Sequence, residues 1–395
     1  MQRCGNRIYL IPIILTLLIA VLFQGGFLTR EKVYANERGY NLKVHFIDVG
    51  QGDCSFIELP DGKTMLIDAG QEEHGKQVVK YIKKLGYDKI DYVVATHADS
   101  DHVGGLSKVI ESFDVAVVYR PFTISNNVKV KGFQDELLEL FQNDETFNAM
   151  ENSEVYAKFL KSAYNETCGD KLCEIRICSD KETIISDSEQ NPYMIKFFMP
   201  YGETEFSTTR ITSGYAVKEQ SGDNETSAVI EIISDGHKYL FAGDLTTAGE
   251  KTLMENMSLA DAEMLSCVSV LKVAHHGSNS STSAEFLALV KPTSSVIMVG
   301  KGNDYGLPAS EVITRLQNIA TTVYRTDELG TIIVEEKQGM LIFDNVESKS
   351  VLERYSWVFY TILIVTTMTI IVIIAVYPKI KNKMILKKDT KKSLN

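Results

Sequence analysis

The stretch THADSDHVGG, residues 96–105, places His97, Asp99, Asp101 and His102 within six positions and ends in two glycines. It follows the apolar run DYVVA, which is typical of a buried strand, and the glycines predict a turn. Histidine and aspartate are metal ligands, and side chains at the end of a strand lie where binding sites are usually built. The stretch therefore predicts a polar site at one edge of a β-sheet.

Three other apolar runs end in the same way. Asp68 follows a strand-like run in LIDAG, Asp244 follows one in LFAGD, and His275 and His276 follow one in VAHHGS. Any one of these residues could merely cap a turn, but the repeated pattern indicates that four strand ends supply one site. Histidine and carboxylate ligands suit one or two divalent ions, which can polarise an ester or phosphoryl oxygen and activate water.

The alternation of short strands and helices predicts the fold class. CSFIEL, a PDG turn and TMLIDAG predict a β-hairpin, and residues 75–86 have the spacing of a helix. Further strand-like runs follow, with predicted helices at 283–290 and 309–319. Two sets of strands interleaved with helices indicate an α+β fold, a four-layer αββα sandwich. We interpret the polar residues 121–190 as an insertion or lid that is helical over 133–164.

Charge and motifs argue against several function classes. The two ends of the chain carry +3 and +6, so the net charge of −11 leaves −20 for residues 36–354. Such an acidic body has no general attraction for nucleic acid. The sequence contains no G-x-S-x-G elbow, no phosphate-binding P-loop and no G-x-G-x-x-G dinucleotide motif, which argues against a serine hydrolase and a nucleotide-binding enzyme.

An uncharged run near the start of the chain predicts a targeting segment. Residues 8–23 carry no charge, and Arg3 and Arg7 precede them. Because small residues follow at the positions that a signal peptidase reads, we expect residues 1–35 to be a signal peptide or an N-terminal anchor.

A second uncharged run near the end predicts a membrane span. It is long enough to cross a bilayer as a helix, and we expect a transmembrane helix at 355–378. Seven lysines follow in residues 379–395, which predicts a cytoplasmic tail. The domain at 36–354 would then lie on the extracytoplasmic side of the cell membrane.

The cysteines give a weaker signal. Cys168, Cys173 and Cys178 cluster at a spacing that permits one local disulfide in an exported protein. Cys54 and Cys267 lie in apolar surroundings, so we expect both to be buried small side chains.

The order of these motifs resembles one family. HADSDH with two following glycines resembles the H-x-H-x-D-H signature of the metallo-β-lactamase superfamily, with Asp99 in place of the second histidine. VHFIDVGQGDC, LIDAG, LFAGDL, LKVAHHGS, GKGNDYGLP and YRTDELGTI also look like motifs of the metallo-β-lactamase domain of ComEC-like proteins. The resemblance covers roughly residues 42–336 and implies the αββα sandwich.

The resemblance implies two divalent ions, Zn²⁺ or Mn²⁺, and a role for each residue of the opening stretch. His97 and Asp99 would bind the first ion, Asp101 and His102 would bind the second, and Asp244 would bridge them. Asp101 would also orient the attacking water, so it is one of two predicted catalytic residues.

The remaining motif residues have supporting roles by the same resemblance. His275 would complete the second site, and His276, the other predicted catalytic residue, would be a neighbouring ligand or a donor behind the ligands. Asp68 would brace the cluster from beneath, and Ser278 would touch the substrate.

The sequence departs from the family pattern at two places. The superfamily usually supplies a third imidazole to the first ion where this chain has GDNETS, so Asp223, Asn224 or Ser227 would have to serve. With Asp99, this makes the first site richer in oxygen, which favours Mn²⁺ or Mg²⁺. Leu307 also replaces a histidine that ComEC-like sequences usually carry before the proline of GKGNDYGLP.

Together, these features predict a membrane-anchored, extracytoplasmic metal-dependent hydrolase that cleaves phosphodiester bonds in a nuclease-like reaction. The substrate would be nucleic acid, which the acidic charge does not favour, or a phosphorylated wall polymer. The alternative is a catalytically weak or inactive binding or sensor protein of the same fold, because the first metal site departs from the pattern. A β-lactamase activity fits the acidic first site less well.

Overall fold

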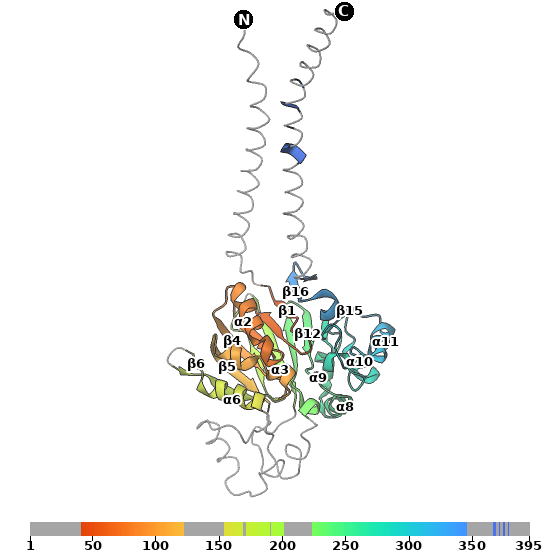
Figure 1. Ribbon diagram of the computed structural model, residues 1–395. Coiled ribbons are helices and arrows are strands. Elements are labelled where there is room, and N and C mark those ends of the chain that lie inside the picture. Colours follow the sequence, from red (N-terminus) through yellow and green to blue (C-terminus); the bar gives the residue numbers. More distant parts are fainter. Residues whose placement is uncertain are drawn as a thin grey trace, which may run out of the picture.

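The computed structural model describes residues 41–121, 154–168, 171–189, 191–200 and 223–345, and a few isolated residues between 366 and 378. Two β-sheets lie face to face in this part of the chain, and helices cover their outer faces (Figure 1). The protein therefore has a mixed α/β fold with two sheets.

The first sheet has eight strands. Their order is β17 (Met340–Asn345), β16 (Ile332–Lys337), β1 (Lys43–Phe46), β2 (Ser55–Glu58), β3 (Thr64–Ile67), β4 (Lys89–Val94), β5 (Asp114–Arg120) and β8 (Glu174–Ile177). β1, β2 and β3 pair in antiparallel fashion, whereas β3, β4, β5 and β8 are parallel. The carboxyl ends of β3 and β4 therefore meet at the same edge.

The second sheet has seven strands. Their order is β15 (Thr322–Arg325), β14 (Ser294–Ile297), β13 (Val270–Lys272), β12 (His237–Phe241), β11 (Val229–Ser234), β10 (Tyr193–Met199) and β9 (Thr183–Ile185). β12, β13, β14 and β15 are parallel, so the carboxyl ends of β12 and β13 also lie together. A separate ribbon pairs β6 (Thr167–Cys168) with β7 (Lys171–Leu172).

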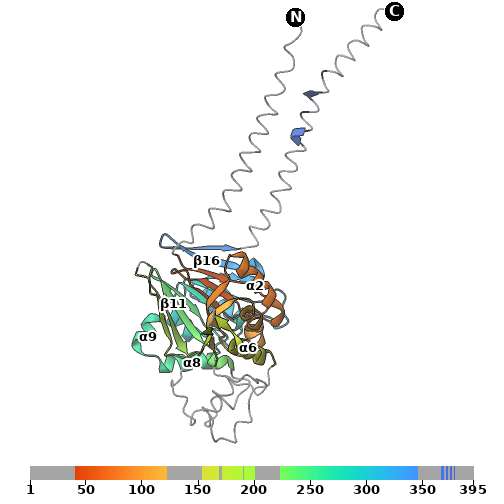
Figure 2. The ribbon, with the colours of Figure 1, turned by 90° about the vertical axis from the view of Figure 1, so that its left-hand side faces the viewer.

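Helices form the two outer layers. The first sheet is covered by α2 (Gly75–Lys84), α4 (Leu106–Ile110) and α6 (Glu154–Asn165), and the second by α8 (Thr247–Asn256), α10 (Ala284–Val290) and α11 (Ser310–Asn318). Shorter helices are η1 (Glu72–His74), α3 (Ser100–Val103), η2 (Asp223–Thr226), α9 (Leu259–Met264), η3 (Ala274–Gly277) and α12 (Thr326–Leu329). α2 and α6 lie on one side of the sheets and α9 on the other (Figure 2).

Aromatic pairs join the two sheets. Phe46 of β1 stacks on Phe241 of β12 with ring centroids 6.0 Å apart, and Tyr119 of β5 lies 5.0 Å from Phe197 of β10. His45, the next residue to Phe46, points to the opposite face, where its Nδ1 lies 2.8 Å from the Tyr81 hydroxyl of α2. This alternation places one core between the sheets, and the burial of apolar area there stabilises the sandwich.

The structure confirms several local predictions. The hairpin forms as β2 and β3, and the three predicted helices correspond to α2, α10 and α11. The interpretation of residues 121–190 as an insertion or lid stays a prediction, and the described part of this range contains α6, β8 and β9. α6 packs against the first core, and β8 and β9 extend the two sheets. The polar strands lie at sheet edges, which explains why the sequence resembled an insertion. The rest of the helix predicted over 133–164 lies outside the described residues.

The predicted segments at 1–35 and 379–395 lie outside the described residues, and that at 355–378 does so except for isolated positions. Among the residues that the structure describes, no helix has the length and apolar character needed to cross a membrane.

The cysteine predictions hold only in part. Cys54 is buried as expected, but Cys267 is exposed. Cys267 lies between α9 and β13 with a φ of 56°, and this turn directs it away from the core. No disulfide joins Cys173 to Cys178, so these two residues do not form the local disulfide expected in the cluster.

Glu336 is a buried carboxylate between the two sheets. Its Oε2 accepts a hydrogen bond of 2.9 Å from Ser234 Oγ, and its Oε1 accepts one of 3.1 Å from the Tyr239 hydroxyl. Burial outweighs these two bonds and raises the pKa of Glu336 from 4.5 to about 7. The folded protein therefore holds this proton more tightly than the unfolded chain does.

We expect the stability gained by Glu336→Gln over wild type to be larger at about pH 8 than at about pH 5. The folded wild type is stabilised while Glu336 is protonated, and it loses this stabilisation as the pH rises through about 7. Glutamine stays neutral and can keep both hydrogen bonds. Thermal denaturation of both proteins across this range measures the effect. Glu335→Gln, one residue away and partly exposed, is the control. A pH-independent difference between Glu336→Gln and wild type would show that Glu336 does not titrate in this way.

Candidate metal centre

Four strand ends from the two sheets supply one polar cluster. Asp68 follows β3, His97 follows β4, Asp244 follows β12, and His276 lies four residues beyond the end of β13. All four side chains are buried. Because each belongs to a run of parallel strands, the topology brings these distant residues to a common edge.

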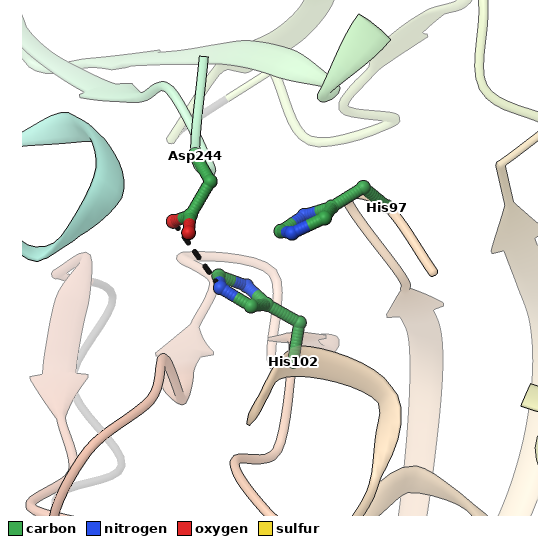
Figure 3. Close-up of side chains that lie close together, drawn as sticks. All are labelled: His97, His102 and Asp244. Carbon is green, nitrogen blue, oxygen red and sulfur yellow. Dashed lines mark ion pairs between the residues drawn. The ribbon is translucent and has the colours of Figure 1, made fainter. Parts of the chain in front are cut away.

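His97, His102 and Asp244 form the centre of the cluster (Figure 3). The His102 Nε2 atom lies 3.2 Å from Asp244 Oδ1, and the two imidazole centroids are 4.1 Å apart. One ligand atom from each residue lies within 4.8 Å of the others. Two imidazoles and a carboxylate at this spacing can hold a divalent ion.

Asp68 and Thr96 fix the orientation of both imidazoles. The Asp68 Oδ2 atom lies 2.8 Å from His102 Nδ1 and accepts a 2.7 Å hydrogen bond from the Thr96 hydroxyl. Because that hydroxyl gives its proton to Asp68, it accepts from His97 Nδ1 at 3.1 Å. Both histidines then carry a proton on Nδ1, which leaves each Nε2 lone pair free for a metal.

A second group joins Asp101 and His102 to His276. The His276 Nε2 atom lies 3.2 Å from Asp101 Oδ2 and 3.5 Å from Asp244 Oδ2. On the other side of the ring, Nδ1 lies 2.9 Å from the Met298 carbonyl oxygen, to which it donates. This arrangement again aims an Nε2 atom at the carboxylates.

His275 lies at the rim instead of inside either group. Its side chain is 28% exposed, its Nε2 is 3.7 Å from Asp244 Oδ2, and its Nδ1 is 3.3 Å from Ser280 Oγ. The sequence predicted that His275 completes the second site, but the structure brings His276 there. Both residues have a positive φ, 50° and 52°, and this backbone turn points the adjacent rings in different directions.

The other predicted residues occupy different distances from the centre. Asp99 precedes α3 and places Oδ2 3.6 Å from His97 Nε2, with 47% of its side chain exposed. Ser227 is buried, and its hydroxyl accepts a 3.1 Å bond from the Asp244 backbone, so it positions that residue. Asn224 is partly buried and accepts from the Ser227 backbone through its carbonyl oxygen. The Ser278 hydroxyl pairs with that of Ser280 on the rim loop at 2.9 Å.

Asp53 and Lys272 belong to the site although their sequence pattern alone indicates no role for them. Asp53 is buried beside the cluster, with Oδ1 3.3 Å from His276 Nδ1, and it forms an ion pair with the buried Lys272. The signals were present in the sequence, since Asp53 follows GQG and Lys272 interrupts the apolar run before VAHHGS. A lysine within a short strand is usually exposed, so the pattern alone did not indicate burial.

Unpaired polar atoms show that the residues fit a cation. Among the described residues, the buried atoms His97 Nε2, His102 Nε2, Asp244 Oδ1 and Asp53 Oδ1 have no hydrogen-bond partner. Buried polar groups in folded proteins are nearly always paired, and an unpaired group needs an explanation. Three of these atoms are the ones that the hydrogen bonds of Asp68, Thr96 and Ser227 position for a metal.

The electrostatics of the cluster also favour a cation. Burial opposes charge on His102 and His276, yet nearby carboxylates raise the pKa of His102 well above its usual value and that of His276 to about 10. Burial opposes charge on Asp244 as well, but these two histidines hold the pKa of that carboxyl well below its usual range. Without a metal, the carboxylates therefore retain protons on the imidazoles, and a divalent ion can replace those protons.

Gly52 sets the approach of the Asp53 loop to Asp101. It has a φ of 139°, and a Cβ at this position would overlap the Asp101 carbonyl oxygen. The next residue, Asp53, donates its backbone N–H to that oxygen at 3.1 Å. Gly62 also has a positive φ, 85°, but a Cβ there would meet nothing within 4 Å.

We expect Gly52→Ala to weaken metal binding by more than about tenfold, because Asp101 must move and supporting residues carry effects of this size. Gly62→Ala should lower stability by roughly 1 kcal/mol through backbone strain alone and leave metal affinity unchanged. Mn²⁺ titration and thermal denaturation of both variants measure the two effects. Equal metal affinities in the two variants would contradict this role for Gly52.

Comparison with known proteins agrees with this geometry. Residues 47–134 match the model of the metallo-beta-lactamase superfamily. The chain is 25% identical over 307 residues to ComE operon protein 3 of Bacillus subtilis, an alignment that covers 73% of this chain and 32% of that protein. It is 36% identical over 110 residues to competence protein ComA of Neisseria gonorrhoeae, covering 28% of this chain and 15% of that protein.

The chain thus spans about a third of the length of ComE operon protein 3. Among solved structures, the metallo-beta-lactamase fold protein YhfI from Bacillus subtilis aligns with a TM-score of 0.41 and 10% identity, covering 75% of this chain and 99% of that one. Residues 47–134 thus match the metallo-β-lactamase superfamily, and the chain is similar to ComEC-like proteins over most of its length.

Proposed function

We propose that the protein is a metal-dependent hydrolase that cleaves phosphodiester bonds with water. The observation that carries this proposal is the convergence of His97 Nε2, His102 Nε2 and Asp244 Oδ1, three buried ligand atoms from both sheets that have no hydrogen-bond partner. The match of residues 47–134 to the metallo-beta-lactamase superfamily supports it, because His97 and His102 lie within the matched segment.

The buried ion would be held by Asp101, His102 and His276, with Asp244 shared between the two sites. Two imidazoles and two carboxylates suit Zn²⁺ or Mn²⁺. This assignment replaces His275 by His276 in the ligand set, because the ring of His276 is buried and aimed at the carboxylates.

The outer ion would be held by His97, Asp99 and Asp244. Asp223 and Asn224 are the remaining candidates for a further ligand, since the hydroxyl of Ser227 already accepts from the Asp244 backbone. With one imidazole and several oxygens, this site would prefer Mn²⁺ or Mg²⁺ more than the buried site does.

The charge of the cluster supports two ions. The cluster and its surroundings contain five carboxylates and one lysine, so the net charge is −4 when the histidines are neutral. The carboxylates are those of Asp53, Asp68, Asp99, Asp101 and Asp244, and the lysine is Lys272. Two divalent cations would neutralise that charge. A single ion would leave two uncompensated negative charges in a largely buried cluster, which is costly in a low dielectric.

Bound divalent ions would supply Lewis acidity toward the phosphoryl group and would lower the pKa of water. The protein would supply orientation and proton transfer. Burial would raise the pKa of Asp101, but His276 and His102 hold it below its usual value, so the carboxylate stays ionised and would orient the attacking water. His275 and Ser278, at the exposed rim, would contact the substrate.

We further propose a membrane-anchored protein with the domain 36–354 on the extracytoplasmic side. The support is the pattern of the predicted segments at 1–35 and 355–378. A phosphorylated wall polymer fits the charge of −20 better than nucleic acid does, although divalent ions would offset part of the repulsion from a polyanion.

The two adjacent histidines provide a sharp test. We expect His276→Ala to lose at least one equivalent of metal and to lower the hydrolysis of bis-p-nitrophenyl phosphate by roughly 100-fold or more, because a ligand is removed. His275→Ala should retain both ions and lose less than about tenfold in rate, because that ring is not a ligand. Elemental analysis and initial rates of the full-length protein measure both properties.

The same experiment separates hydrolysis from the alternative of a binding or sensor protein. If the wild type holds one ion tightly and hydrolyses neither the diester nor linear DNA with Mn²⁺, the enzymatic proposal is wrong and the binding function is favoured. If His275→Ala loses the metal and His276→Ala keeps it, the ligand assignment is wrong.

A further inference from the structure

Lys272 is a buried cation beneath the metal centre. Its side chain is 2% exposed at the end of β13, and its Nζ donates a 2.9 Å hydrogen bond to the Gly243 carbonyl oxygen. The same ammonium forms an ion pair with Asp53 and lies 3.9 Å from Asp244 Oδ1. Because a buried ammonium is stable only when it is paired, these acids account for the burial of Lys272.

Asp53 lies on the side of the histidines that faces away from the candidate ions. Its Oδ1 is 3.3 Å from His276 Nδ1, and its Oδ2 is 3.9 Å from His102 Nδ1. Asp53 nevertheless meets the spacing of a metal ligand, because it forms a group with Asp244 and His276. Its carboxylate can therefore pair with the ammonium of Lys272 or bind an ion.

We propose that Lys272 is a positioning residue that holds Asp53 out of the ligand set and fixes the charge of the centre. This inference rests on the metal-binding part of the proposed function. The ion pair of Lys272 and Asp53 leaves Asp244 free to bind both ions. It also keeps the Asp53 carboxylate beside Nδ1 of His276, which favours the ring orientation with Nε2 toward the metal.

The two members of the pair should have opposite effects when removed singly. Without the ammonium, the buried Asp53 carboxylate loses its cationic partner, and its spacing from Asp244 and His276 allows it to bind a metal ion. Without the Asp53 carboxylate, the nearest acid to the ammonium is Asp244, and the lysine then competes with the ions for it. Removal of both charges restores the balance of the centre.

The test compares Lys272→Met, Asp53→Asn and the double variant in the full-length protein. The proteins are stripped of metal and titrated with Mn²⁺ and Zn²⁺ in competition with a fluorescent chelator. We expect Lys272→Met to bind about tenfold more tightly, Asp53→Asn about tenfold more weakly, and the double variant within about threefold of wild type. Lys238→Met is the matched control, because Lys238 is a strand lysine whose Nζ bonds the Met264 and Ser266 carbonyls instead.

Opposite shifts with recovery in the double variant support the proposal, since a purely structural ion pair would weaken metal binding in both single variants. Parallel shifts, or unchanged affinities, overturn it. If Lys272→Met does not fold, a weaker Asp53→Asn and a restored double variant still support the proposal, and any other pattern overturns it. A wild type that binds metal without hydrolysing diesters overturns only the proposed activity, whereas one that binds no metal overturns both.

Discussion

The candidate metal centre depends on how one buried carboxylate distributes its hydrogen bonds. Asp68 accepts from the backbone and hydroxyl of Thr96 and from the Nδ1 atom of His102. The Thr96 hydroxyl has one proton, and giving it to Asp68 obliges the oxygen to accept from His97. One carboxylate therefore sets the tautomer of two imidazoles. Asp68 has a φ of 58°, a region that costs energy for a residue with a side chain, and these buried bonds hold it there.

The sandwich brings the acid that completes the centre from the other sheet. The Ala228 N–H donates to the Thr96 carbonyl oxygen at 3.0 Å, so the strand ends of the two sheets are hydrogen-bonded beside the site. Ser227, next to Ala228, holds the backbone of Asp244. At Gly243, a Cβ would lie 3.0 Å from the Cβ atoms of Ser227 and Thr96, so the absence of a side chain permits this close approach. The fold thereby controls the distance between histidines from one sheet and an aspartate from the other.

The sequence alone predicts the positions of site residues that depend on a local pattern. It does not predict side-chain burial or orientation that depends on contacts between distant segments. The strand-end positions of Asp68, His97 and Asp244 follow from apolar periodicity, which is local. The choice between His275 and His276 depends on two successive left-handed backbone conformations, which no periodicity encodes. The burial of Lys272 depends on Asp53, a partner from the other sheet. The edge strands β8 and β9 are polar because sheet edges are partly exposed, and for that reason they resembled an insertion.

The same geometry argues that the two candidate sites differ in affinity. The inner group, Asp101, His102 and His276, has two buried imidazoles whose orientation is fixed by Asp68 and by the Met298 carbonyl. The outer group has one imidazole and Asp99, whose side chain is 47% exposed and is held by no cap hydrogen bond to α3. Ordering a half-exposed carboxylate costs conformational entropy, whereas the inner ligands are already ordered. The inner site would therefore fill first, and an ion at the outer site would exchange more readily.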